Sequence, residues 1–158
     1  NDPKIMIFTA FSILGPVLVY PMPQNVSFTS EHFTTNILPL IKSEIEKLKG
    51  VSKPSKVRIH MDNAKPHNAK RTLEKLDELH FERLPQPPYS PDISPNDFFL
   101  YGYIKEKLKG SHFTSREDLI SAIVDIIQKI DKSVWISVYE EWMRRLQLVI
   151  DNNGDYVK

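Results

Sequence analysis

The chain has 158 residues, of which 41% are hydrophobic and 26% charged, and its formal net charge is +1. This composition is typical of one soluble globular domain, and no apolar run approaches the roughly 20 residues that a membrane span needs. Cysteine is absent, which excludes disulfides and thiolate metal sites. The net charge of +1 does not identify a partner. If the chain binds nucleic acid, its basic residues must therefore be concentrated on one face.

The first part of the chain predicts a hairpin followed by a helix. β-branched and aromatic runs at 5–11 and 17–20 flank the turn dipeptide Gly15-Pro16, as in a β-hairpin. Apolar residues with helical spacing over 33–48 predict a helix that Pro39 kinks or splits and that Gly50 closes, before a loop at 52–55. The start of the chain has no initiator Met and no signal segment, so we expect it to lie inside a longer polypeptide.

The middle of the chain reads as strand, helix and strand. The run 57–61 is short and β-branched and predicts a strand buried on both sides, and 81–84 predicts the next strand. A helix begins at Pro66 between them. Its expected inward stripe comprises Ala69, Leu73, Leu76 and Leu79. This order predicts a right-handed parallel crossover, with ligands beyond the carboxyl ends of the strands, where Asp62 lies.

A proline-rich loop then leads into three helices. Prolines over 85–95 predict a stiff, irregular loop, and Ser94 and Pro95 predict the cap and first residue of a helix with Asp97 in its first turn and Gly110 at its end. The expected inward stripe of this helix comprises Phe98, Tyr101, Ile104 and Leu108. A second helix begins with the capping box Thr114 and Glu117, and helical spacing from Trp135 to Val149 predicts the last.

Asp62 and Asp97 are candidate metal ligands, with 34 residues between them. Two-metal phosphoryl chemistry needs carboxylates from different elements that converge on ions about 4 Å apart, and Mg²⁺ prefers oxygen ligands. On the residues alone a structural explanation is at least as good. Asp62 would then cap the helix behind it, and Asp97 would complement the dipole of its own helix.

Three segments carry a family resemblance: Met-Asp-Asn-Ala-Lys-Pro-His-Asn-Ala at 61–69, the stretch 84–100 with Tyr-Ser-Pro-Asp-Ile-Ser-Pro-Asn-Asp, and Leu-Lys-Gly at 108–110. They resemble the catalytic domain of mariner transposases, in the Tc1/mariner superfamily, and the similarity extends over essentially the whole chain. The resemblance implies an α/β, ribonuclease-H-like fold with a mixed sheet and flanking helices. It also implies a triad of acids in which 34 residues separate the second from a third that is Asp.

By this resemblance Asp62 is the second catalytic acid and Asp97 the third, both ligands of a two-metal site for Mg²⁺ or Mn²⁺. Asp92 matches a motif position outside the triad and is interpreted as a turn residue. Asn63 and His67 are candidates for supporting the metal or contacting DNA, although a surface histidine explains His67 equally well. Candidate phosphate contacts are Lys105, Lys107, Lys109, Arg144 and Arg145, for which solvated helix faces are an equal explanation.

The resemblance also predicts what the chain lacks. The first acid, the first central strand and the helix-turn-helix region of the family have no counterpart, so residues 1–158 are expected to form a single partial domain starting at the second strand. The missing strand would leave backbone groups unpaired at about 1–3 kcal/mol each. We therefore expect stable folding only within a longer protein or after rearrangement.

The expected function is that of a fragment of a cut-and-paste DNA transposase, acting in the nucleus as a homodimer on transposon ends and target DNA. The alternative is a degenerate or co-opted module that binds DNA or dimerises without cleaving. A nucleotide-binding α/β domain ranks last, because no glycine-rich phosphate loop follows a strand.

Overall fold

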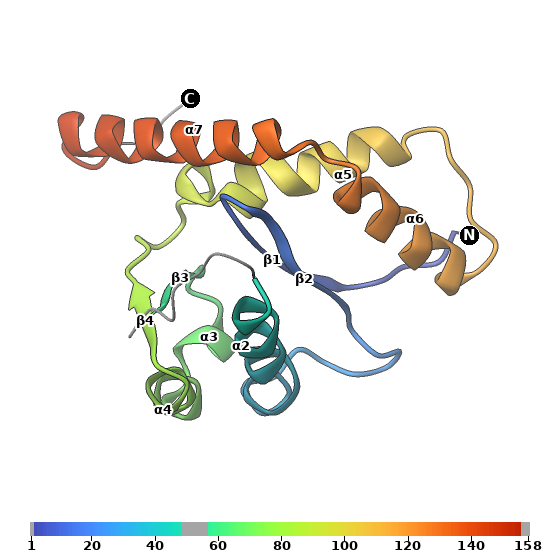
Figure 1. The fold of residues 1–158 in the computed structure, drawn as a ribbon, viewed down its shortest axis with the longest axis horizontal. Helices are drawn as coiled ribbons and strands as arrows, with labels where there is room; N and C mark the ends of the chain where they lie inside the picture. The colour runs from blue at the N-terminus through green and yellow to red at the C-terminus, as the bar shows by residue number, and fades with distance from the viewer. Residues whose placement is uncertain (1, 49–56, 156–158) are drawn as a thin grey trace. The chain divides into compact units, whose positions relative to one another are not determined.

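The computed structural model describes residues 2–48 and 57–155. They form two compact units, here named the terminal unit, Asn1–Pro21 with Ser90–Lys158, and the central unit, Met22–Tyr89. Each unit contains one two-stranded sheet and its own helices (Figure 1). None of the described helices combines the length and apolarity needed to cross a bilayer.

The terminal unit begins with the predicted hairpin. β1 (Ile7–Ser12) pairs antiparallel with β2 (Gly15–Pro21), with an irregularity between Ala10 and Phe11. The turn lies one step earlier than Gly15-Pro16, because Gly15 already pairs with Ser12. Gly15 has φ +120°, and an added Cβ would lie 3.7 Å from the Trp135 ring, so glycine serves both the turn and the close approach.

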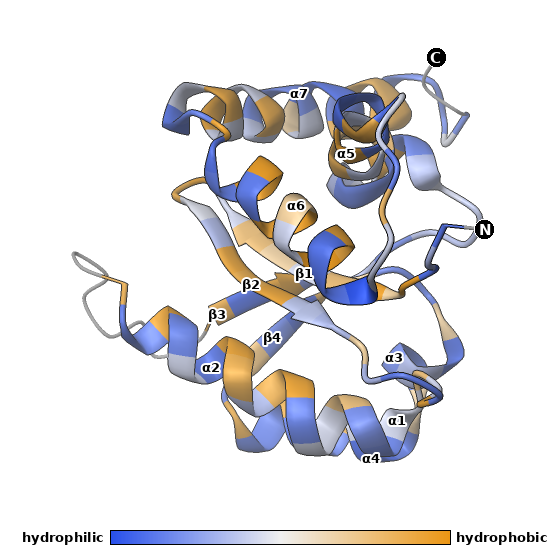
Figure 2. Ribbon diagram, turned by 90° about the vertical axis from the view of Figure 1, so that its right-hand side faces the viewer, coloured by the Kyte–Doolittle hydropathy of each residue, from blue (hydrophilic) through white to orange (hydrophobic). Residues whose placement is uncertain are grey.

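The helical elements of the terminal unit follow one another from residue 91 onward. They are η2 (Pro91–Ile93), η3 (Asn96–Leu100), α5 (Tyr101–Leu108), α6 (Arg116–Gln128) and α7 (Lys132–Asp151). Figure 2 shows hydrophobic and hydrophilic stretches alternating along α6 and α7, as amphipathic helices require. Partly buried residues of the hairpin, among them Ile7, Phe11 and Val19, pack against a buried core. This core comprises Leu100, Ile104, Ile123, Ile127, Ile130 and Trp135.

Two sequence predictions in this unit were wrong by one residue. Of the predicted inward stripe, Ile104 is buried as expected, but Tyr101 is 39% exposed and Leu100, only 1% exposed, faces inward in its place. The cause is the π-helical first turn, in which the Tyr101 N–H donates to the Asn96 carbonyl five residues earlier. The cap of α6 is Ser115, which accepts from the Asp118 N–H at 3.0 Å, and not Thr114. Gly110, with φ +78°, follows the end of α5 as predicted.

The central unit starts with one continuous helical run. It comprises α1 (Ser30–His32), η1 (Phe33–Ile37) and α2 (Leu38–Glu46). The run changes from π to α geometry at Leu38, so Pro39 lies in the first turn of α2, where its missing N–H is tolerated. Gly50 and the loop 52–55 lie outside the described residues.

The parallel strand pair of the central unit is confirmed. β3 (Val57–His60) and β4 (Phe81–Leu84) run parallel, joined through α3 (Lys65–Asn68) and α4 (Lys70–Glu78). β3 is not buried on both sides as predicted. Its Arg58 side chain is 72% exposed and lies 3.5 Å from Glu82 on β4.

The helix predicted from Pro66 is broken at Ala69, where the backbone is extended with ψ 144°. Leu76 of the predicted stripe is buried, but Leu73 is 47% exposed and Thr72, directly after the break, is fully buried in its place. The Thr72 hydroxyl donates to the Pro66 carbonyl across the break. A buried hydroxyl thus replaces a leucine as the inward residue.

Candidate metal and nucleic acid site

Asp62 lies just beyond the carboxyl end of β3, in the loop that leads to α3. Its Oδ1 accepts a hydrogen bond from the Ala64 N–H at 3.0 Å and another from His67 Nδ1 at 2.8 Å. The side chain is 54% exposed. One carboxylate oxygen is therefore held by the protein, and the side chain still reaches solvent.

His67 is buried, with its side chain only 10% exposed, and is not the surface histidine that the sequence allowed. Its ring lies 5.5 Å from the ring of Phe28 and 4.9 Å from that of Phe33, measured between centroids. Nε2 is buried without a hydrogen-bond partner among the described residues. Nδ1 is the ring nitrogen that faces Asp62, and it lies 3.3 Å from the Asp62 carbonyl oxygen as well as 2.8 Å from the carboxylate.

The hydrogen bond from His67 lowers the pKa of Asp62 below its ordinary value. Burial opposes this effect, while the Ala64 N–H and the positive charge of Arg83 add to it. Asp62 is thus kept ionised, which a carboxylate needs in order to bind a cation.

Arg83 on β4 is a site residue that sequence reasoning missed. Its guanidinium donates to the His67 carbonyl at 2.8 Å and to the Asp62 carbonyl at 3.0 Å. It therefore ties both ends of the Asp62–His67 segment to the neighbouring strand. The sequence signal was an arginine inside a predicted strand, which gives no indication of its partners.

Asn63 also holds this segment in place. Its side-chain amide donates to the Gln86 carbonyl at 2.6 Å, and its own carbonyl accepts from the Asn68 side chain at 2.9 Å. Asn63 thus links the loops that follow β3 and β4.

Asp97 lies in the terminal unit, in the first turn of η3, and is exposed. Its N–H and that of Phe98 both donate to the Ser94 carbonyl at 2.9 Å. Ser94 therefore begins the helix through its carbonyl, while no side-chain cap is present at this end. The neighbouring Asn96 accepts a hydrogen bond from the Thr9 hydroxyl of β1 at 2.8 Å.

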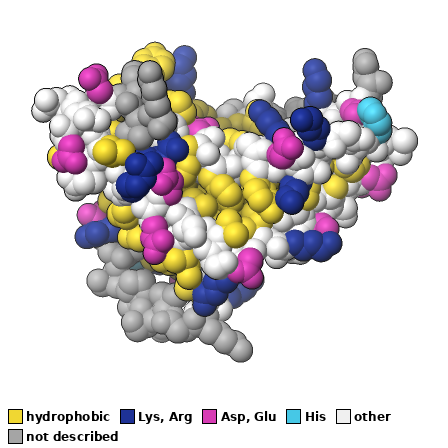
Figure 3. Space-filling view, turned by 90° about the horizontal axis from the view of Figure 1, so that it is seen from above, with side chains coloured by type: hydrophobic (Ala, Val, Ile, Leu, Met, Phe, Trp, Pro, Cys, Tyr) yellow, Lys and Arg dark blue, Asp and Glu magenta, His cyan; other side chains and the backbone are white. Residues whose placement is uncertain are grey.

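The predicted phosphate contacts differ in how open they are. Lys105, Lys107 and Lys109 are exposed at the end of α5. Arg144 is 55% exposed, but the Arg145 side chain is only 19% exposed. Figure 3 views the side on which α7 lies and shows Lys and Arg side chains beside hydrophobic ones.

Both arginines bond to Glu141 on the same helix. Arg144 donates to it at 2.8 and 2.7 Å, and Arg145 at 2.8 Å. These bonds lower the pKa of Glu141 to about 2. Arg145 also donates to the Asp92 carbonyl inside the same unit, whereas Arg144 remains largely in solvent.

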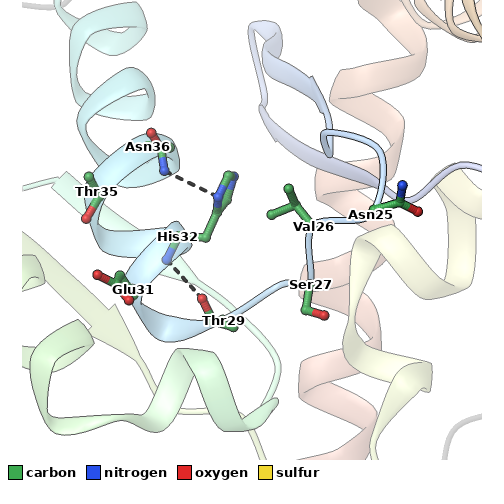
Figure 4. A pocket seen from close by; sticks show the side chains of 8 residues that line it. All are labelled: Asn25, Val26, Ser27, Thr29, Glu31, His32, Thr35 and Asn36. Atoms are coloured by element: carbon green, nitrogen blue, oxygen red, sulfur yellow. Dashed lines mark hydrogen bonds between the residues drawn. The ribbon is translucent and has the colours of Figure 1, made fainter.

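A shallow hollow of about 490 Å³ lies elsewhere in the central unit, lined by residues between Asn25 and Asn36 (Figure 4). Within it, the His32 N–H donates to the Thr29 hydroxyl at 3.1 Å, and the Asn36 amide lies 3.3 Å from His32 Nδ1. Its lining residues include none of the predicted site residues.

Comparison with known proteins finds relatives among transposases, and no family model matches the chain. The human histone-lysine N-methyltransferase SETMAR is 29% identical over 154 residues, which is 97% of this chain and 22% of that protein. The mariner Mos1 transposase of Drosophila mauritiana is 28% identical over 98 residues, covering 61% of this chain and 28% of the transposase. The chain thus spans less than a third of either relative.

Solved structures agree with these sequence matches. The catalytic domain of Mos1 mariner transposase has a TM-score of 0.90 at 20% identity, covering all of this chain and 78% of that one. This chain is homologous to mariner-type transposase catalytic domains. Its fold is ribonuclease-H-like, as the sequence predicted. Mos1 catalytic domain with Raltegravir and Mg has a TM-score of 0.88, with 20% identity and 98% and 77% coverage. The Mos1 transposase paired-end complex with left transposon end has a TM-score of 0.86 at 20% identity, covering all of this chain and 47% of that one.

The two candidate acids of this chain offer carboxylate oxygens of the kind that a hard cation prefers. Asp62 belongs to the central unit and Asp97 to the terminal unit, and both side chains are exposed to solvent. Within residues 2–48 and 57–155, no group of three His, Cys, Asp or Glu side chains gathers around one point. Within either unit, the described residues thus form no complete set of metal ligands.

Proposed function

We propose that this chain is the catalytic part of a DNA transposase that cleaves transposon ends and joins them to target DNA, with Asp62 and Asp97 as metal ligands. The observation that carries the proposal is the state of Asp62, a half-exposed carboxylate at a strand end with one oxygen held by His67 at 2.8 Å. The spacing of 34 residues to Asp97 supports it, in a chain homologous to mariner-type catalytic domains.

The metal would be Mg²⁺ or Mn²⁺. Mos1 catalytic domain structures with each of these ions have the same fold as this chain. When bound, such ions activate the attacking oxygen and stabilise the leaving one. The contribution of this chain is to keep Asp62 ionised through His67 and Ala64, and to present Asp97 from the first turn of η3.

The partner would be DNA, bound through the exposed Lys105, Lys107, Lys109 and Arg144. Mos1 structures of the same fold include a paired-end complex with left transposon end, which supports this assignment. Binding through such residues releases counterions, so affinity should fall steeply with salt. Action as a homodimer in the nucleus belongs to the same proposal.

The test uses the full-length protein with Asp62→Ala and Asp97→Ala, measuring metal-dependent cleavage of transposon-end DNA and DNA binding in parallel. Each variant should abolish cleavage and bind DNA nearly as well as wild type. Asp125→Ala is the matched control, because Asp125 is an exposed acid that pairs with Lys129 at 2.8 Å on α6. Cleavage retained by either site variant would remove that residue from the site.

A co-opted, non-catalytic module is the second candidate. The observation that favours it is that a matching region makes up 22% of a relative named for histone methylation. A domain of this kind therefore occurs within a protein named for other chemistry. Salt-sensitive DNA binding by wild type, without cleavage in either metal, would support this candidate over the first.

A further inference from the structure

The side chain of Asp97 is exposed on the first turn of η3. The position of its carboxylate therefore depends on how the backbone of this segment is held. The segment before it contains Pro91 and Pro95, which restrict φ but do not determine where the segment lies. A metal ligand must be placed to a fraction of an ångström, because a shift of about 1 Å can cost about a hundredfold in rate. Some other element must therefore fix the segment.

The helix α7 contacts the segment on both sides of Asp97. Before it, Trp142 Nε1 donates to the Ile93 carbonyl at 2.9 Å, and Arg145 donates to the Asp92 carbonyl at 2.9 Å. After it, the Arg145 guanidinium lies over the Phe98 ring, 4.4 Å from the centroid. Two consecutive carbonyls and the next aromatic ring are thus fixed by two residues one helical turn apart.

Arg145 is itself held in one orientation. Its Nε donates to Glu141 at 2.8 Å, so the guanidinium is bonded at one end to its own helix and at the other to the Asp92 carbonyl. Its side chain is 19% exposed, which leaves little of it for a DNA phosphate. A planar guanidinium that is bonded at both edges and stacked on a ring is a rigid spacer between two elements.

We propose that Trp142 and Arg145 are positioning residues for Asp97, with α7 acting as the brace that fixes the Ser90–Phe98 segment. The inference deepens the proposed function, and rests on it only for the role of Asp97 in catalysis. It also reassigns Arg145 from a candidate phosphate contact to a structural support of the candidate metal ligand.

The first measurement is amide hydrogen exchange in the full-length protein, which needs neither metal nor DNA. In Arg145→Ala the amides of Asp97 and Phe98 should exchange at least about tenfold faster than in wild type, because the carbonyls before them lose their support. Arg144→Ala is the charge-matched control, since Arg144 is 55% exposed and its bonds among the described residues run to Glu141, and it should leave exchange there unchanged. Equal exchange in the two variants would overturn the proposal.

The second measurement is the kinetics of DNA cleavage. Arg145→Ala should lower kcat about tenfold to a hundredfold with KM for DNA unchanged, whereas loss of a phosphate contact would raise KM and reduce the salt dependence. Gln147→Ala, an exposed change on the same helix, should keep the wild-type kcat. A change in KM alone, or a loss of kcat that only matches the unfolded fraction, would refute the positioning role.

Trp142→Phe keeps an aromatic ring but removes the N–H that donates to Ile93, so it tests the brace even where Arg145→Ala folds poorly. It should speed exchange at Asp97 and lower kcat with KM unchanged, and wild-type values in both would count against the proposal. Asp97→Ala in the same cleavage assay tests the role of Asp97 in catalysis separately from the support of its segment by α7. If Asp97→Ala cleaves normally, Asp97 is removed from the proposed site, while hydrogen exchange still decides whether α7 fixes the segment.

Discussion

Replacing His67 by Phe should impair cleavage while leaving stability nearly unchanged. The hydrogen bond from Nδ1 to the Asp62 carboxylate, 2.8 Å long, is of a kind that contributes about 1.5–3 kcal/mol. Against this loss, Phe removes the buried Nε2 that has no partner among the described residues, an atom of a kind that costs about 1–3 kcal/mol. Phe also keeps the ring contacts with Phe28 and Phe33.

The two terms nearly cancel, so the free energy of unfolding should change by no more than about 1 kcal/mol. Asp62 then keeps only the Ala64 N–H on its Oδ1, and its half-exposed side chain gains freedom to rotate. Loss of a residue that orients a metal ligand typically costs about 10–100-fold in metal affinity or activity.

The assay is chemical denaturation together with metal-dependent cleavage by the full-length protein, followed over a range of Mg²⁺ concentrations. His112→Phe is the control, because the His112 side chain is 87% exposed. Wild-type cleavage at every Mg²⁺ concentration would refute the orienting role of His67. A loss of stability well above 1 kcal/mol would show that removing the unpaired Nε2 does not offset the lost hydrogen bond to Asp62.

The remaining predictions concern helix phase and pH. Thr72→Val should lower the free energy of unfolding by about 1–2 kcal/mol, since it removes the buried donor to the Pro66 carbonyl. Leu73→Ala, at an exposed position, should change it by no more than about 0.5 kcal/mol. If a urea titration gave the opposite order, the helix would follow the inward stripe predicted from the sequence. The pKa of Glu141 falls from its ordinary 4.5 to about 2 on folding, so its stabilisation is fully present above pH 4.5 and is lost as pH drops through 2. Unfolding measured between pH 5 and 2 should therefore show a smaller acid loss for Glu141→Gln than for wild type, and equal losses would contradict the ion-pair assignment.

Sequence patterns predicted the strands and the order of the helices, because period and turn residues are local properties. They were wrong about which helix residues face inward at Tyr101 and Leu73, both of which are exposed. A π-helical turn at Asn96–Leu100 and an extended residue at Ala69 each change which side chains face inward, and neither has a clear signal in single-residue propensity. Leu100 and Thr72 were missed as core residues for this reason.

The candidate acids were found because motif and spacing are visible in the sequence, but their supports were not. Arg83 acts on the backbone carbonyls of Asp62 and His67, across the parallel strand pair. Arg145 was predicted as a phosphate contact from its charge alone, although Glu141 four residues earlier on a helix is a recognisable partner. Charge in a sequence indicates that a partner is needed, and only the fold tells whether the protein itself supplies it.

The two acids share one physical solution to a common difficulty. A carboxylate that binds a metal must keep oxygen lone pairs open, so side-chain bonds that hold it in place also compete with the metal. In the central unit Arg83 supports the backbone of Asp62 and a single bond from His67 orients one oxygen. In the terminal unit Arg145 supports the backbone beside Asp97 and leaves its carboxylate exposed. Replacing Arg145 removes a donor to the Asp92 carbonyl and so displaces Asp97 without changing its carboxylate. The charge of Arg83 also lowers the pKa of Asp62, so of the two arginines only Arg145 separates positioning from electrostatics.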